Sequence, residues 1–200
     1  MSVSPASVDQ IEACAGWYGR PMTAARHDGD RSKSRAETPW VVRCWWLWTI
    51  AALVAGGVTV AAADGFPIVD LELAWTVERA NDVTKGADFD TIRSAILWDF
   101  AFILFYALAL STAALWARRQ FHSPAGAAVG TVVAIGGVVA GLLDVVENLS
   151  MLGYLNGWGD WSGWIALAGT TAVPKFLLAL AGVLYIVTGI VLFLVRRSSH

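Results

Sequence analysis

The sequence predicts an all-α integral membrane protein in which four transmembrane helices form an antiparallel bundle, with short interfacial helices in the external loops. Composition is the first reason: of 200 residues, 56% are hydrophobic and 15% are charged, against about 25% charged in globular domains. Length is the second, because each of four apolar runs is close to the ~20 residues that cross a ~30 Å hydrocarbon core. The predicted spans are residues 44–63, 97–117, 125–148 and 176–195. The third reason is a small-residue face on the third span, which is typical of helices packed in lipid.

Residues 1–39 are polar, of mixed charge and without a sustained apolar stripe, which predicts a disordered cytoplasmic tail. The first span follows this tail and ends at Ala61-Ala62-Ala63, which resembles a signal-peptidase site. The polar region ahead of it is far longer than the start of a signal peptide. We therefore favour an uncleaved membrane span.

Orientation follows from the distribution of basic residues, since cytoplasmic loops are enriched in Lys and Arg. The tail and Arg43 lie on one predicted side, together with the Arg118-Arg119 and Arg196-Arg197 pairs. The other side has few basic residues. We expect a multi-pass protein of the plasma (inner) membrane with both termini cytoplasmic. The excess of Arg over Lys and the abundant Ala favour a bacterial source.

Two external loops are predicted, at residues 64–93 and 153–174. In the first, Ile68, Leu71 and Trp75 recur at helical spacing, which predicts a short helix lying on the membrane interface. The second is rich in Gly and Trp, and we expect an interfacial or re-entrant segment there.

Five small residues share one face of the third span, at spacings of three or four. They are Gly126, Gly130, Ala134, Gly137 and Gly141. Small residues let neighbouring backbones approach closely, either within the chain or in a homo-oligomer or a complex with a partner membrane protein. Asp144 and Asn148 continue this stripe, so we expect both side chains to point into the bundle.

Ionisable residues occur at one predicted depth, one in each span. Asp64, Asp99, Asp144 and Lys175 each lie about 20 residues from the cytoplasmic flank, a rise of roughly 30 Å, which is close to the outer leaflet. Asp64 and Lys175 end their apolar runs, so we interpret them as boundary charges, the lysine extending toward the headgroups. Asp99 and Asp144 have apolar neighbours on both sides and carry the prediction of a polar site.

The chemistry expected of this site is acid–base. Asp144, Glu147 and Asn148 are spaced to share a helix face, and neighbouring carboxylates in low dielectric can divide general acid and base roles. The candidate catalytic residues are Asp99, Asp144 and Glu147, with Lys175 or Arg93 as the counter-charge. The candidate ligand-binding residues are Asn148, Lys175, Tyr106, Tyr185 and Asp64. The two tyrosines lie at similar depth, and we expect each to bond the other, Thr59 or Thr188.

Several functions are disfavoured by the sequence. His27, His122 and His200 are all predicted to be cytoplasmic, so no transition-metal site is expected in the polar layer, although its oxygens suit a hard cation. No phosphate-binding loop or hydrolase motif occurs in the sequence, and we predict neither a metal nor a cofactor. The basic residues are too scattered for nucleic-acid binding.

Three functions remain open. The polar layer could bind or act on a membrane lipid or another amphiphile. Alternatively, it could hold together a non-enzymatic membrane subunit, such as an assembly factor or a sensor. Intramembrane carboxylates also serve proton- or ion-coupled transport, although charges in a single layer give no path across the membrane.

Overall fold

The computed structural model describes residues 39–199, so all but the last residue of the predicted tail lies outside the described part. Within residues 39–199 the ordered elements are all helices. In chain order they are α2 (Trp40–Arg43), α3 (Trp45–Ala62), α4 (Ile68–Glu72), α5 (Val77–Thr84), α6 (Phe89–Ala117), the 3₁₀ turn η1 (Arg118–Gln120), α7 (Pro124–Leu155) and α8 (Trp161–Ser198).

Four of the helices in this range, α3, α6, α7 and α8, are long and apolar enough to cross a membrane, as predicted. Their outward faces are covered with large aliphatic side chains; Leu53, Val60 and Val132 are each about 70% exposed (72%, 73% and 69%). Soluble monomers rarely expose apolar surface on this scale, because each such side chain orders water at a cost in free energy.

Helix α3 stays within its predicted span, but α6, α7 and α8 extend beyond theirs, and side-chain caps start α6 and α8 earlier than predicted. Asp88 accepts hydrogen bonds from the backbone N–H groups of Asp90 and Thr91, so α6 begins at Phe89. Asp160 caps α8 through the Ser162 N–H. The expectation of a loop over residues 153–174 is therefore wrong for most of its length, since α7 continues to Leu155 and α8 already begins at Trp161.

Two short helices, α4 and α5, lie between α3 and α6. The predicted helical spacing is only partly realised, because Ile68 and Leu71 lie in α4 but Trp75 follows its end, with a φ of 56°. A large apolar cluster anchors this region to the ends of the long helices. It comprises Leu71, Ala74, Ala80, Ile92, Ile96, Met151, Tyr154, Leu155, Ile165 and Ala168.

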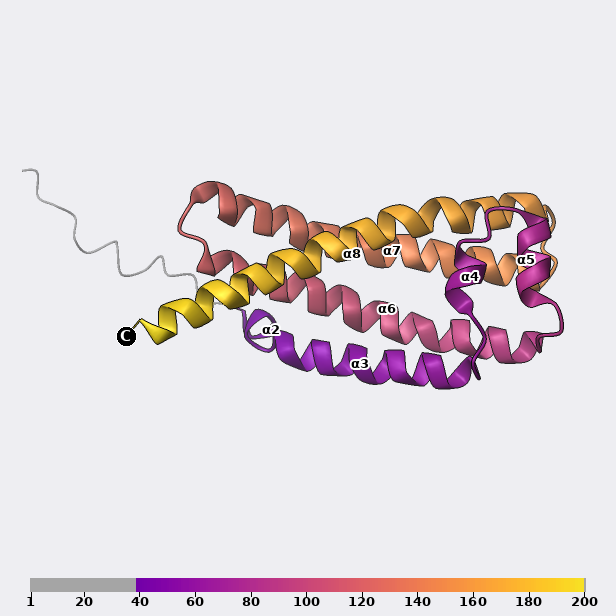
Figure 1. Ribbon diagram of the computed structural model, residues 1–200, viewed down its shortest axis with the longest axis horizontal. Coiled ribbons are helices and arrows are strands. Elements are labelled where there is room, and N and C mark those ends of the chain that lie inside the picture. Colours follow the sequence, from indigo (N-terminus) through magenta and orange to yellow (C-terminus); the bar gives the residue numbers. More distant parts are fainter. Residues whose placement is uncertain (1–38, 200) are drawn as a thin grey trace, which may run out of the picture. The chain divides into compact units, whose positions relative to one another are not determined.

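The long helices lie alongside one another, with α4, α5 and the α7–α8 connection at one end (Figure 1). Helix α7 packs against both α6 and α8, whereas α3 packs along α6 and makes almost no contact with α8. Four of the five small residues of α7, namely Gly130, Ala134, Gly137 and Gly141, are buried. A Cβ at Gly141 would lie 2.9 Å from that of Ala107, so this face is filled by α6 of the same chain.

Candidate functional site

A cavity of about 930 Å³ occupies the space that α3 leaves open toward α8. Side chains of α3, α6 and α8 line its length, and the segment between Ala63 and Glu72 closes one end. Its surface is mostly apolar, with Leu53, Val60 and Phe176 among the exposed lining residues. Pockets that bind small molecules have volumes of about 300–1,000 Å³, so this one has room for such a ligand.

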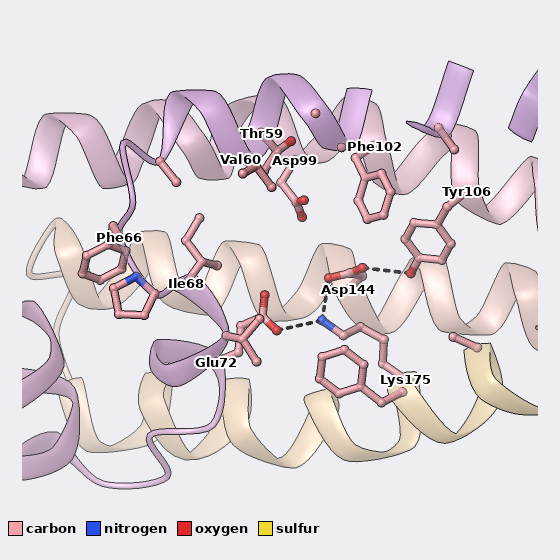
Figure 2. Close-up of a pocket in the computed structure, with 18 of the residues that line it drawn as sticks. Thr59, Val60, Phe66, Ile68, Glu72, Asp99, Phe102, Tyr106, Asp144 and Lys175 are labelled. Atoms are coloured by element: carbon pink, nitrogen blue, oxygen red, sulfur yellow. Dashed lines mark hydrogen bonds and ion pairs between the residues drawn. The ribbon is translucent and has the colours of Figure 1, made fainter. Parts of the chain in front are cut away.

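Polar groups gather on one wall of this cavity. Figure 2 shows Asp99, Phe102 and Tyr106 pointing from α6 toward the space that they share with Asp144 and Lys175. The Tyr106 hydroxyl donates a hydrogen bond of 2.8 Å to Asp144 Oδ2. The cavity therefore joins a long apolar surface to a compact polar region.

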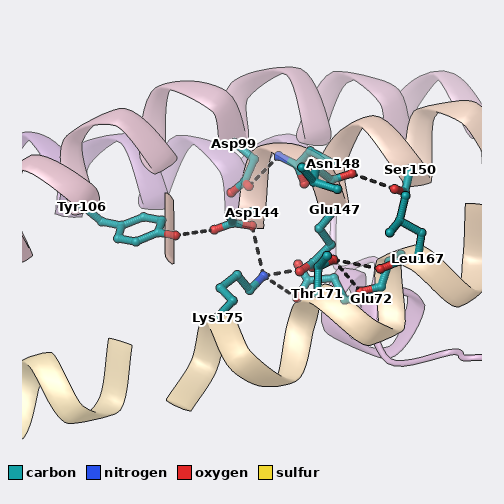
Figure 3. Close-up of polar contacts among 12 residues, drawn as sticks. Glu72, Asp99, Tyr106, Asp144, Glu147, Asn148, Ser150, Leu167, Thr171 and Lys175 are labelled. Carbon is teal, nitrogen blue, oxygen red and sulfur yellow. Dashed lines mark hydrogen bonds and ion pairs between the residues drawn. The ribbon is translucent and has the colours of Figure 1, made fainter. Parts of the chain in front are cut away.

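Lys175 is the centre of the polar region. Its Nζ donates to Glu147 Oε1 at 2.9 Å, to Asp144 Oδ1 at 3.0 Å and to Glu72 Oε2 at 3.3 Å (Figure 3). The lysine is only 5% exposed, so the interpretation of a boundary charge extending to the headgroups is wrong. An ammonium group has three N–H donors, and here each of them has a carboxylate partner.

Asp99 lies on the cavity wall next to this cluster. Its Oδ2 accepts a hydrogen bond of 2.8 Å from Asn148 Nδ2, which fixes the carboxylate from α7. Among the ion pairs of the described residues, none includes Asp99. Glu147, by contrast, is fully buried behind the wall, and its Oε2 has no hydrogen-bond partner there.

The predicted site residues thus fall into two groups. Asp99, Asp144, Tyr106 and Lys175 line the cavity, and Glu147 and Asn148 support them from behind. The remaining candidates lie elsewhere in the structure.

Asp64 is exposed in the turn after α3 and does not line the cavity. Tyr185 donates to the Gly126 carbonyl and stacks on Phe121, so the expected partners of both tyrosines were wrong. Arg93 binds Asp90 and the Leu155 carbonyl, so of the two predicted counter-charges it is Lys175 that pairs with the carboxylates of the site.

Glu72 is a site residue that the sequence did not single out. It is 7% exposed and lies on α4, where it reaches Lys175. One signal pointed to it: Glu72 directly follows Leu71, on the short helix predicted from apolar spacing. A charged residue on a short interfacial helix is ordinarily solvated. The burial of Glu72 could therefore be recognised only from its contact with Lys175, which is far away in the sequence.

The described residues of this site are rich in carboxylates and include no histidine or cysteine. Among residues 39–199, no group of three or more His, Cys, Asp or Glu side chains is placed to hold a metal ion. Comparison with protein-family models, with characterised proteins and with solved structures finds no match to this chain.

Proposed function

We propose that this protein is a multi-pass protein of the plasma (inner) membrane whose four long helices form an antiparallel bundle with both termini in the cytoplasm. The exposed aliphatic faces of these helices support membrane insertion. The orientation is supported by the basic residues at the end of the helices opposite α4 and α5. This end carries Arg43, Arg118, Arg119, Arg196 and Arg197.

Within this frame, we propose that the cavity binds a membrane lipid or another amphiphile. The supporting observation is the opening between α3 and α8, where an apolar surface leads to Asp99, Asp144 and Lys175. An alkyl chain entering from the bilayer would lie along α3, while its head group would contact the polar wall. Both parts of the ligand would keep an environment like that in the membrane, so little desolvation would oppose binding.

If the bound amphiphile also reacts, Asp99 is the carboxylate best placed for proton transfer. Both oxygens of Asp144 are already engaged, one by Tyr106 and one by Lys175. Glu147 is shielded from the cavity. Acid–base catalysis therefore stays a prediction, in which Asp99 would transfer the proton and Tyr106 would be the nearby hydroxyl group that can donate a hydrogen bond.

Filling the cavity tests the binding function. A Cβ at Gly57 would meet no atom within 4 Å although the residue lines the cavity, so Gly57→Leu places a side chain there without a clash. The matched control is Ala61→Leu, on an exposed part of the same helix that does not line the cavity. Native mass spectrometry of both proteins, released from membranes, should show co-purifying amphiphiles only with Ala61→Leu and wild type. Equal occupancy in all three would refute the proposal.

A structural role for the polar cluster is the second candidate. It is supported by Lys175, which joins α4, α7 and α8 through three ion pairs. In that case Asp99→Asn and Gly57→Leu would leave the amount of bound amphiphile unchanged. Substitutions at Lys175 would lower the stability of the protein and nothing else.

A further inference from the structure

The charge balance of the cavity wall indicates which head group it accepts. Glu72, Asp99 and Asp144 line the cavity with Lys175, and Glu147 lies directly behind them. Among the described residues the wall thus has four carboxyl groups and one ammonium group, and only Glu72, Asp144 and Glu147 pair with that ammonium group. The wall is short of positive charge and of hydrogen-bond donors, and Glu147 Oε2, which is buried without a partner, shows the same shortage.

Among the described residues that line the cavity, an anionic head group would find no free cation. Lys175 already has a carboxylate within 3.3 Å of each of its available donors. A phosphate or carboxylate approaching it would also lie close to Asp144, and like charges in a medium of low dielectric repel strongly. A zwitterionic phospholipid would bring its phosphate to the same wall.

A cationic head group has two complementary partners. Asp99 is half-buried on the wall and held by Asn148, and it forms no ion pair with any cation in residues 39–199. Phe102 lies one turn along α6 and also lines the cavity, where its ring is 5.1 Å from that of Tyr106. Figure 2 shows the Asp99 carboxylate and the Phe102 ring directed into the same space. A carboxylate beside an aromatic face is the combination that recognises amines and quaternary ammonium groups.

We propose that the ligand is an amphiphile with a single cationic head group, an amine or quaternary ammonium, which pairs with Asp99 and contacts the Phe102 ring while its hydrocarbon part lies along α3. This inference rests on the proposed amphiphile-binding function and gives its ligand class. Ion pairing with Asp99, a carboxylate outside the Lys175 cluster, would add positive charge to a wall with more carboxyl groups than cations.

The test compares three probes with the same twelve-carbon tail: dodecyltrimethylammonium, dodecanol and dodecanoate. Binding to purified protein in a neutral maltoside detergent is measured by isothermal titration calorimetry at neutral pH. We expect the ammonium probe to bind at least tenfold more tightly than the alcohol, and the carboxylate probe to bind most weakly. Asp99→Asn should abolish this preference while leaving dodecanol binding unchanged, since an asparagine can still accept from Asn148.

Phe102→Leu serves as a second variant that leaves the carboxylate and its hydrogen bond in place. It should weaken binding of the ammonium probe several-fold and change dodecanol binding little. Equal affinities for the three probes, or a preference for dodecanoate, would overturn the cationic head group while leaving amphiphile binding intact. If no probe binds, or if Gly57→Leu and Ala61→Leu bind all probes alike, the proposed function itself fails.

Discussion

Lys175 on α8 and Glu72 on α4 are 103 residues apart in the chain, yet Lys175 Nζ and Glu72 Oε2 lie 3.3 Å apart in a buried environment. This contact ties the segment that closes one end of the cavity to the helix that forms its far side. The same ammonium holds Asp144 and Glu147 of α7. A single lysine thus connects three helices at the polar wall.

Removing this lysine should strongly destabilise the protein. Lys175→Met keeps the length of the side chain but leaves three buried carboxylates without a counter-charge, and breaking a buried pair in this way costs about 3–5 kcal/mol. We expect a large fall in the thermal unfolding midpoint of the purified protein in detergent. Lys85→Met, at an exposed position after α5, is the matched control and should unfold like wild type. Equal midpoints for the two variants would contradict the assigned network.

Comparing Tyr106→Phe with Tyr185→Phe separates an effect on stability from an effect on ligand binding. The change removes the 2.8 Å hydrogen bond to Asp144. Hydrogen bonds to charged groups contribute roughly 1.5–3 kcal/mol, and the half-buried hydroxyl places this one near the lower limit. Because Tyr106 also lines the cavity, calorimetry should show altered affinity for the ammonium probe. Tyr185→Phe loses a bond to the Gly126 carbonyl outside the cavity, so it should lower stability alone. Identical binding by both variants would argue against a role for Tyr106.

Alanine should have opposite effects at two glycines of α7, Gly141 on the small-residue face and Gly136 outside it. A Cβ at Gly141 would lie 2.9 Å from Ala107 Cβ, a short side chain that cannot rotate away. Gly141→Ala should therefore destabilise by about 1–3 kcal/mol, the usual range for overpacking. At Gly136 the nearest atom is Leu178 Cδ2 at 3.4 Å, an ordinary contact, so Gly136→Ala should stabilise by up to about 1 kcal/mol through lower backbone entropy in the unfolded chain. Denaturant titration in mixed micelles measures both, and a stabilising Gly141→Ala would contradict the packing of α7 on α6.

The cap of α6 predicts a local effect of acid. The Thr91 hydroxyl and the backbone N–H of Asp90 hold the pKa of Asp88 below its usual value of 3.8. A carboxyl group whose pKa is lower in the folded state stabilises the helix end fully above pH 3.8, and this stabilisation disappears as the pH falls through the folded pKa. The protection factors of the amides of residues 90–93, that is, their exchange rates relative to the intrinsic rates at the same pH, should therefore fall in acid. In Asp88→Ala the same amides should exchange quickly at neutral pH as well, whereas Asp88→Asn, which can still accept at the cap, should resemble wild type. Slow exchange in Asp88→Ala would rule out the cap.

The sequence predicted the four long helices because hydropathy and length are local properties of each segment. It also predicted an inward face on α7, since spacing alone puts Asp144, Glu147 and Asn148 on one side, and all three are at most 5% exposed. Helix ends were harder to predict. The start of α8 depends on a single cap at Asp160, within a segment rich in Gly and Trp that resembles a loop.

The partners of the polar groups were decided only by the tertiary structure. Composition and depth predicted a layer containing Asp99, Asp144 and Lys175, but not that Lys175 is buried among carboxylates or that Glu72 joins them. The sequence did not predict the cavity either, because it arises where α3 packs along α6 and stays apart from α8. Hydropathy and length determine which segments form helices long and apolar enough to cross a membrane, since both are properties of each segment by itself. The packing of separate helices determines which side chains are in contact and where a cavity remains. This packing depends on many contacts between residues that are far apart in the chain.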